Sequence, residues 1–438
     1  MYFLKFGVSI SLFGMIINFS GEELMYRQLN LQTDTNINDT VKFRPGDNIQ
    51  TIISTKPAGT IYSFAPGVYR IISPVVPKDG DMLLGEPGTA ISGSKIISTW
   101  NDSVDFWYAK GYLPPPYKGT GTCEDDITNP CHACENVFRD GIALKRVMEP
   151  DDLTTGTFYA DYRSNRIWIR DDPEGHLLEV AVAPSIINSD AENVTVKGII
   201  IEKCASRAQV GAIQFSGSGW AIINCEVRFN HGTGIRDYGD NARIIKNRIH
   251  HNGQLGIGGN KITGTIMEGN EIAFNNTDGF WVMDWEGGGI KFCRASFTLR
   301  SNNIHDNLCV GVWCDIDCKG VIIESNSITN NAADGIRYEI SYDAIIRNNV
   351  IQNNDWHMGR KKGINLHYGG GINIHTSSNV EIYGNSVSDN LNGIGLVRTN
   401  RGKGMYGTWD LVNVKVHNNF ISMTNGVTGL LQNIKDDS

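Results

Sequence analysis

Short apolar runs alternate with Asn and Gly turns along the second half of the chain in a fixed order. An Asn stands two positions before an Ile or Val, a second Asn follows three positions after it, and a Gly-Ile or Gly-Val pair comes next. The unit recurs about every 22 to 24 residues with two longer steps, a period typical of stacked structural repeats. Its copies begin at Asn247, Asn270, Asn302, Asn326, Asn348 and Asn385, and a weaker copy begins at Cys225.

A unit of this length and composition is one coil of a β-solenoid. Short strands separated by tight turns cannot bury an apolar face alone, so the coils stack and share one core. The leucine-rich frame that has a similar period is absent. Asn at a turn tolerates the left-handed conformation, and its amide bonds to the coils above and below. We therefore predict structural roles for Asn230, Asn252, Asn275, Asn307, Asn331 and Asn353.

Strand alternation predicts which side chains leave the core, because successive residues point to opposite faces. If the residue after each repeat Gly points inward, a β-branched inward column forms from Ile235, Ile257, Ile290, Val312, Ile336, Ile372 and Ile394. The first outward column is Arg236, Gly258, Lys291, Trp313, Arg337, Asn373 and Gly395. The second is Tyr238, Asn260, Cys293, Asp315, Glu339, His375 and Val397. We expect both outward columns to face solvent.

The first half of the chain divides into three parts. Residues 1–20 have the layout of a signal peptide, with an N-terminal membrane anchor as the alternative. Residues 40–97 predict an N-terminal cap, with a short helix N-capped by Asp47, and the first coil. Residues 98–184 lose the coil pattern and alternate with period two, which predicts an inserted antiparallel β-subdomain. The solenoid occupies 185–438, and since no C-terminal cap is evident, we expect a missing segment or a partner at its open end.

The entry segment from Phe43 to Tyr69 resembles that of pectin-lyase-like β-helix proteins. The stretches 249–257 and 339–347 also look most like this group. The resemblance implies an all-β, right-handed parallel β-helix that is secreted or at the cell surface. It further implies action on a polysaccharide or oligosaccharide, since many members are lyases, hydrolases or epimerases; fold alone does not choose the reaction.

Charge and cysteine usage narrow the class of partner. A net charge of −8 argues against a nucleic-acid partner, which needs a concentrated basic face. After signal cleavage we expect no membrane association. Nine cysteines fit an exported protein, and for the loop with Cys123, Cys131 and Cys134 a disulfide is preferred over a zinc site.

Charged and aromatic residues gather on one face of the predicted solenoid. Strands of neighbouring coils lie about 4.8 Å apart, so groups in the outward columns converge on one ligand. The candidate catalytic residues are Asp315, Glu339, Lys291, Arg337 and His375, and the candidate substrate-binding residues are Trp313, Arg236, Asn373, Asp284, Trp285, Glu286 and Trp356. The enlarged coils place extra residues at 276–288 and 354–370, at the same turn. We expect these loops to wall the face and to carry Trp281, Asp284, Trp285, Glu286, Trp356, His357 and His367 toward it.

Three functions fit this face. Glycoside hydrolysis needs two flanking carboxyl groups, and Asp315 with Glu339 offers them; we expect Glu339 as the acid and Asp315 as the nucleophile, with the reverse left open. A polysaccharide lyase would need a base and a cation for the uronate. A non-catalytic glycan-binding or adhesion solenoid is the third reading. No cofactor is required, and Ca²⁺ on Asp315, Asp317 and Glu339 is a weaker alternative. His250 and His251, at a turn, are expected to be solvated or satisfied.

Overall fold

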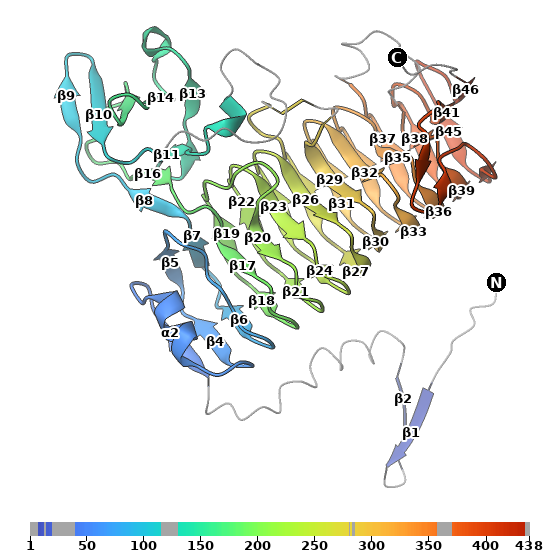
Figure 1. The fold of residues 1–438 in the computed structure, drawn as a ribbon, viewed down its shortest axis with the longest axis horizontal. Coiled ribbons are helices and arrows are strands. Elements are labelled where there is room, and N and C mark those ends of the chain that lie inside the picture. The colour runs from blue at the N-terminus through green and yellow to red at the C-terminus, as the bar shows by residue number, and fades with distance from the viewer. Residues whose placement is uncertain are drawn as a thin grey trace. The chain divides into compact units, whose positions relative to one another are not determined.

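The computed structural model describes residues 40–114, 130–279, 281–282, 285–356 and 370–433, and the backbone of 8–12 and 15–19. The chain forms two units, Met1–Val41 and Lys42–Ser438. In the first, β1 (Val8–Leu12) and β2 (Met15–Phe19) pair as an antiparallel hairpin. The second carries a cap helix, an inserted subdomain and a row of stacked coils (Figure 1). The signal peptide stays a prediction.

Three long sheets run along the coils and are the three sides of the solenoid. Sheet 1 contains β17 (Ile187–Ser189), β20 (Gly211–Phe215), β23 (Thr233–Asp237), β26 (Leu255–Asn260), β29 (Gly288–Cys293), β32 (Val310–Asp315), β35 (Ile336–Glu339), β38 (Ile372–His375), β41 (Ile394–Arg398) and β46 (Gly429–Asn433). Sheet 2 contains β3 (Val41–Phe43), β4 (Ile61–Phe64), β6 (Met82–Gly85), β18 (Thr195–Lys197), β21 (Ala221–Ile223), β24 (Arg243–Ile245), β27 (Thr263–Glu268), β30 (Ser296–Arg300), β33 (Lys319–Glu324), β36 (Tyr342–Arg347), β39 (Ser378–Tyr383) and β44 (Lys415–His417). Sheet 3 contains β5 (Gly67–Arg70), β7 (Thr89–Ser92), β19 (Ile200–Glu202), β22 (Glu226–Arg228), β25 (Arg248–His250), β28 (Glu271–Ala273), β31 (Asn303–His305), β34 (Ser327–Thr329), β37 (Val350–Gln352), β40 (Ser386–Ser388) and β45 (Phe420–Ser422).

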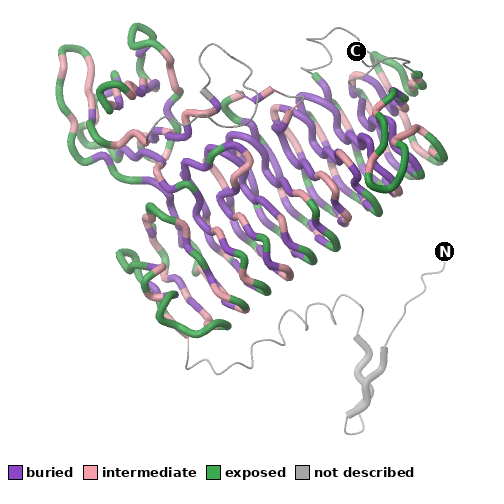
Figure 2. Tube along the Cα trace, in the orientation of Figure 1, coloured by how far each residue is buried: buried purple, intermediate pink, exposed green. Residues whose placement is uncertain are grey.

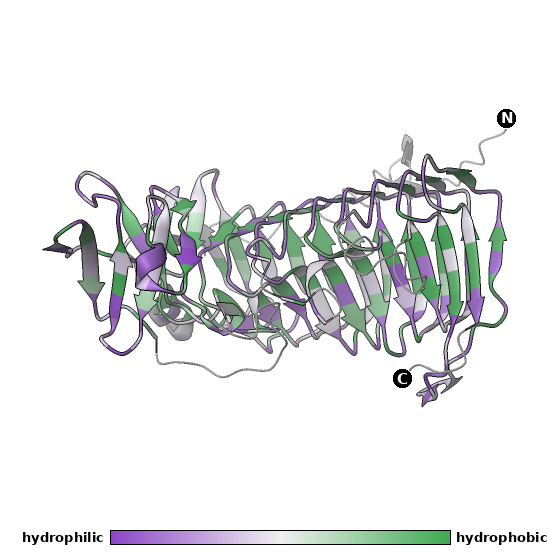
Figure 3. Ribbon diagram, turned by 90° about the horizontal axis from the view of Figure 1, so that it is seen from above, coloured by the Kyte–Doolittle hydropathy of each residue, from purple (hydrophilic) through white to green (hydrophobic). Residues whose placement is uncertain are grey.

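The chain crosses sheet 2, then sheet 3, then sheet 1 in each coil, and successive coils pair in parallel. The predicted inward column is confirmed: Ile235, Ile257, Ile290, Val312, Ile336, Ile372 and Ile394 are Cα partners of one another along sheet 1 and are all buried. Buried positions recur along the stacked coils, whereas the last coil, β44 to β46, is exposed or half-buried (Figure 2). Hydrophobic positions recur at matching places on neighbouring strands (Figure 3). The β-branched stack is therefore the core.

Two ladders of buried Asn side chains connect neighbouring coils by hydrogen bonds, one at the turn on each side of sheet 3. At each rung one Asn donates its amide to the Asn of the next coil, as Asn307 does to Asn331 at 2.9 Å. The ladder between sheets 3 and 1 consists of Asn230, Asn252, Asn275, Asn307, Asn331, Asn354 and Asn390. The prediction for Asn353 is wrong by one residue. Asn353 is exposed and has a φ of 56°, a left-handed conformation that Asn tolerates at a turn. Its neighbour Asn354 is buried and forms the rung of the ladder.

The N-terminal end of the solenoid is closed by helix α2 (Ile49–Thr55), which buries Ile49 and Ile53. Its N-cap is Asn48, whose side-chain oxygen accepts from the amide of Thr51 at 3.0 Å. The expected cap, Asp47, instead accepts from the amide of Arg44 and tightens the preceding turn. The prediction missed by one residue because both side chains are good acceptors at this position.

The inserted subdomain leaves the solenoid between β7 and β17 and contains two small sheets. Their strands are β8 (Ser94–Ile96), β9 (Asn101–Ser103), β10 (Phe106–Lys110), β11 (Val137–Arg139), β12 (Ile142–Ala143), β13 (Lys145–Val147), β14 (Thr157–Asp161), β15 (Arg166–Ile169) and β16 (Leu178–Ala181). All pair antiparallel except β13 with β14. Short 3-10 turns lie at Pro130–His132 and Pro150–Asp152. Buried Glu179 accepts from Arg70 and Lys203 and so links the subdomain to the coils.

The ladder assignment predicts unequal effects at two adjacent residues. Asn354→Ala removes bonds to Asn390 and Ile328 and leaves buried partners unsatisfied, so unfolding free energy should fall by about 2 to 3 kcal/mol in urea titrations. Asn353→Gly, the matched control, keeps the left-handed turn and should change stability by less than about 0.5 kcal/mol. Equal losses in both variants would contradict the assignment.

Candidate functional site

The outer face of sheet 1 carries the two columns predicted from the repeat. Lys291 is the Cα partner of Trp313, Trp313 of Arg337, and Arg337 of Asn373. In the second column, Cys293 pairs with Asp315 and Glu339 pairs with His375. The predicted register is confirmed. Asp315 and Glu339 end the neighbouring strands β32 and β35.

Exposure of these columns was predicted wrongly. Arg236, Lys291, Trp313, Asp315, Arg337, Glu339, Asn373 and His375 are all buried, with Asp315 and Glu339 each 8% exposed. Charges this deeply buried need partners, and here they pair with one another across strands and with side chains from the turns on both sides of the sheet. The face is a packed ionic network.

Lys291 is the centre of one half of the network. Its Nζ lies 3.1 Å from Asp315 Oδ2, donates to the carbonyl of Trp285 at 2.8 Å, and sits 3.5 Å from the centroid of the Trp313 ring. Cys293 lies beside Asp315 in the register. Burial raises the pKa of Asp315 above its ordinary value, and the charge of Glu339 adds to the rise, whereas Lys291 opposes it.

Glu339 is the centre of the other half. Its Oε1 lies 2.7 Å from Arg401 and 3.3 Å from His375 Nδ1, and its Oε2 accepts from the indole N–H of Trp313 at 3.2 Å. Burial acts to raise the pKa of Glu339, but the hydrogen bond from His375 and the charges of Arg337, His375 and Arg401 outweigh it, so the pKa falls well below its ordinary value. As pH falls, Asp315 therefore takes up a proton before Glu339, the reverse of the expected order.

The remaining predicted residues support these two halves. Arg337 donates to buried Asp334 at 2.6 Å, and its guanidinium lies 4.7 Å from the Trp313 ring centroid. His375 contacts Thr399 through Nε2 at 3.1 Å. Asn373 lies beside Arg337 in the register. Trp313 thus contacts a cation from each neighbouring strand, which suits a residue that orients Glu339.

Arg236 reaches the site across a neighbouring strand. A Cβ at Gly258, its partner on β26, would come within 2.5 Å of the Arg236 guanidinium, so glycine leaves room for the side chain to cross. Arg236 then lies 3.4 Å from Glu286 and donates to the Tyr238 hydroxyl at 3.0 Å. Glu286 is thereby brought to the face, as predicted.

The two enlarged coils leave the solenoid between sheets 3 and 1, as predicted, at 274–287 and 353–371. Trp281 does not reach the carboxylates, because it is buried against Cys131 of the subdomain and Ala208. Trp285 packs on the same cluster and contacts the site through its carbonyl. Trp356 is 44% exposed and donates to the carbonyl of Asn330. Asp284, His357 and His367 lie outside the described residues.

Three contributors to the network were missed by sequence reasoning. Asp334 precedes a repeat Gly, and Thr399 and Arg401 follow β41. Arg401 belongs to a third enlargement, between β41 and β44, on the opposite side of sheet 1 from the other two loops. The spacing of the ladder residues does indicate this enlargement. Asn385 and Asn419 form neighbouring rungs but lie 34 residues apart in the sequence, whereas an ordinary coil has about 22 to 24.

The carboxylates do not gather around Asp317. Its Oδ1 accepts from the amide of Met405 and the indole N–H of Trp409, both at 3.0 Å. Across the described ranges no group of three or more His, Cys, Asp or Glu is arranged to hold a metal. Calcium on Asp315, Asp317 and Glu339 stays a prediction.

The cysteine prediction has a clear outcome in the described part of the chain. Cys131 is disulfide-bonded, whereas Cys134, Cys204, Cys225, Cys293, Cys309, Cys314 and Cys318 carry thiols. His250, the lower-ranked candidate, contacts Glu226 at 3.0 Å and His251 at 2.7 Å through its ring nitrogens.

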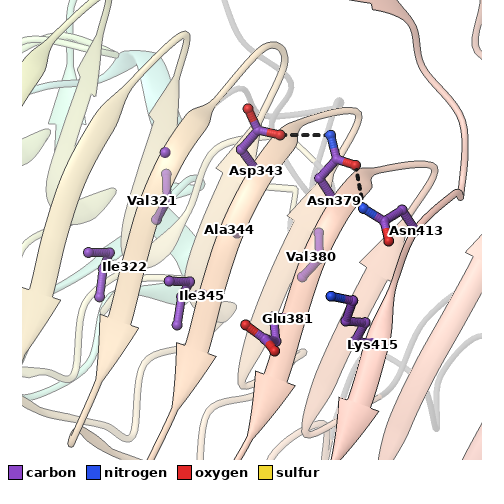
Figure 4. A pocket seen from close by; sticks show the side chains of 11 residues that line it. Val321, Ile322, Asp343, Ala344, Ile345, Asn379, Val380, Glu381, Asn413 and Lys415 are labelled. Atoms are coloured by element: carbon purple, nitrogen blue, oxygen red, sulfur yellow. Dashed lines mark hydrogen bonds between the residues drawn. The ribbon is translucent and has the colours of Figure 1, made fainter.

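A shallow hollow of about 360 Å³ lies on a different sheet (Figure 4). Ile322 and Ile345 of sheet 2 form part of its floor, and a hydrogen-bonded row of Asp343, Asn379 and Asn413 borders it. The hollow holds no group from the ionic network. Chemistry therefore places the candidate site on sheet 1, because the convergent titratable groups are there.

Comparisons with known proteins agree with the architecture. Residues 211–371 match a family model described as a right-handed beta helix region. The structure of XylC with xylose aligns with a TM-score of 0.67 at 17% identity, over 80% of this chain and 69% of that chain. The A-module of the mannuronan C-5 epimerase AlgE4 of Azotobacter vinelandii aligns with a TM-score of 0.48 at 14% identity, over 89% and 94%. No curated protein matches.

These findings define the class of fold. The solenoid is a right-handed parallel β-helix, as predicted. At 17% identity the likeness to XylC speaks for the fold alone.

Removing the Lys291 cation tests the network. Lys291→Met leaves buried Asp315 without its nearest cation, which should cost about 3 to 5 kcal/mol of unfolding free energy at pH 8. A buried carboxyl whose folded pKa is raised loses stability as pH rises, so the loss should be smaller at pH 5. Denaturant titrations at both pH values measure it, and Lys291→Met with Asp315→Asn should recover most of the loss. A pH-independent loss would contradict the pairing.

Proposed function

We propose that this chain is a glycoside hydrolase that cleaves a neutral polysaccharide or oligosaccharide with retention of configuration. The observation that carries the proposal is the placement of Asp315 and Glu339 at equivalent positions on the adjacent strands β32 and β35. Strand spacing puts their carboxyl groups about 5 to 6 Å apart, near the separation of about 5 to 5.5 Å that retaining glycosidases use.

The two carboxyl groups also differ in environment, as retention requires. One must be ionised to attack the anomeric carbon while the other, protonated, gives its proton to the leaving oxygen. In the second step the deprotonated donor takes a proton from water, and the resulting hydroxide equivalent displaces the enzyme carboxylate from the anomeric carbon. The opposite pKa directions of Asp315 and Glu339 support such a division.

The charge pairing supports hydrolysis over β-elimination. A lyase needs cations to neutralise the uronate and a base to remove its proton. Each basic group of the network already has a carboxylate partner: Lys291 has Asp315, Arg236 has Glu286, Arg337 has Asp334, and His375 and Arg401 share Glu339. A neutral sugar leaves these pairs intact. XylC, with the same fold, was solved with xylose, a neutral sugar.

Burial of the pair favours one alternative, a non-catalytic glycan-binding β-helix in which the network only stiffens the surface. Ion networks of this kind also occur as purely structural features. The two functions differ in turnover, because the binding protein would hold an oligosaccharide without releasing new reducing ends.

We place the protein outside the cell or on its surface. The apolar stretch 6–19 supports export, and the disulfide at Cys131 supports an oxidising compartment. Searched over the described residues, the structure contains no helix with the length and apolarity to span a bilayer.

Substitution of either carboxyl tests the proposal. Asp315→Asn and Glu339→Gln should each lower turnover by at least about a thousandfold on an aryl glycoside of a neutral sugar, because each removes an essential group. Stability should also fall, since both groups are buried and paired; circular dichroism below the melting temperature checks that the fold persists. Glu381→Gln, a carboxylate on sheet 2, is the matched control and should retain activity.

Chemical rescue assigns the roles. Sodium azide added to the alanine variant of the nucleophile should give a sugar azide of inverted configuration, and added to the variant of the donor should give one of retained configuration. Full activity in either Asn or Gln variant removes that residue from the mechanism. An unsaturated product from polygalacturonate would favour the lyase, and binding without turnover would favour the binding protein.

A further inference from the structure

The segment 399–414 replaces an ordinary turn between sheets 1 and 2. The corresponding turn of the preceding coil, between β38 and β39, contains only residues 376–377. The longer segment folds into a hairpin of β42 (Lys403–Gly404) and β43 (Gly407–Thr408). The hairpin contacts residues of earlier coils, namely Asp317 in the turn after β32 and Tyr342 at the start of β36. It therefore extends back along the solenoid.

Asp317, in the turn after β32, is the main attachment point of this hairpin. One carboxylate oxygen accepts from both the Met405 amide and the Trp409 indole at 3.0 Å. The approach requires glycine at 404, where a Cβ would lie 1.8 Å from that oxygen. Asp317 is only 6% exposed, so the bonds are shielded from water.

A second set of contacts holds the tip and the base of the hairpin. The Tyr342 hydroxyl donates to the Gly407 carbonyl at 2.8 Å, and its ring meets Tyr406 edge to face at 5.5 Å. At the base, Arg398 donates two hydrogen bonds to Asp410. The hairpin is thus tied to three different coils.

This attachment brings Arg401 to the carboxylate pair. Arg401 precedes β42 by two residues, and its guanidinium lies 2.7 Å from Glu339 Oε1. The Arg401 side chain is 30% exposed, so the contact lies at the edge of the network, on the side reached from solvent.

We propose that Asp317 is a positioning residue that holds the hairpin so that Arg401 orients Glu339 for the reaction. The inference rests on the proposed function. It gives Asp317, considered from sequence only as a calcium ligand, a role in assembling the site from a segment more than 80 residues away, the span of the bond to Met405 being 88.

The pH profile reports this role. The charged groups that face Glu339 are Arg337 on its own strand, His375 on β38, Arg401 on the hairpin segment and Asp315 on β32. Release of Arg401 removes one of the three cations that lower the pKa of Glu339. The limb of the pH profile that Glu339 controls should therefore move to higher pH.

Asp317 has a left-handed backbone conformation, with φ at 59°, so a substitution must tolerate a positive φ. Asp317→Gly removes the acceptor without straining a left-handed position, whereas Asp317→Asn keeps an acceptor oxygen. On an aryl glycoside, Asp317→Gly and Arg401→Gln should each lower kcat about tenfold and shift the limb. Asp317→Asn should resemble the wild type, and the double variant should be no worse than either single variant.

A readout independent of activity separates this inference from the proposed function. Released from Asp317, the hairpin should be cut by trypsin after Arg401 or Lys403 faster in Asp317→Gly than in the wild type or Asp317→Asn. Unchanged cleavage, or an unshifted pH limb in an active Asp317→Gly enzyme, overturns the positioning role. If the wild type lacks hydrolase activity on every glycan but cleavage follows the prediction, the hairpin attachment stands and the catalytic part of the inference falls with the proposed function.

Discussion

Parallel pairing of equivalent positions on successive coils is the constraint on which the rest of the structure depends. Backbone hydrogen bonds set the coils about 4.8 Å apart, and the two Asn ladders lock each turn to the next. Once the register is set, every position becomes a column: a β-branched stack inside and a row of ionic and aromatic groups outside. Asp315 and Glu339 are close because their strands are neighbours, and no special loop is needed to bring them together.

The same constraint explains why much of the architecture could be predicted. The Gly-Ile alternation fixes the phase of each strand, so the sequence alone assigns residues as separate as Lys291 and Asn373 to one column, and the register confirms it. Errors arose where two neighbours have similar chemistry. Asn353 and Asn354 both suit a turn, as do Asp47 and Asn48, and only the backbone angles decide which side chain turns inward.

Burial of the face lay beyond sequence reasoning because it depends on segments that reach the face from far along the chain. Glu286 meets Arg236 across 50 residues, and Arg401 meets Glu339 across 62. The repeat pattern shows where a loop leaves the solenoid but carries no information on how it returns. Trp281 illustrates the limit, since it leaves at the predicted turn and packs on the inserted subdomain.

A buried network of matched charges keeps its geometry without a ligand, as a catalytic pair requires. Under the proposed mechanism, the close spacing of Asp315 and Glu339 predicts retention, because adjacent strands leave no space for a water between the carboxyl groups and the sugar. Proton NMR of the first sugar released from an aryl glycoside, recorded before mutarotation, tests this directly. We predict a product with the anomeric configuration of the substrate. A product of inverted configuration would contradict a mechanism built on two carboxylates of neighbouring strands.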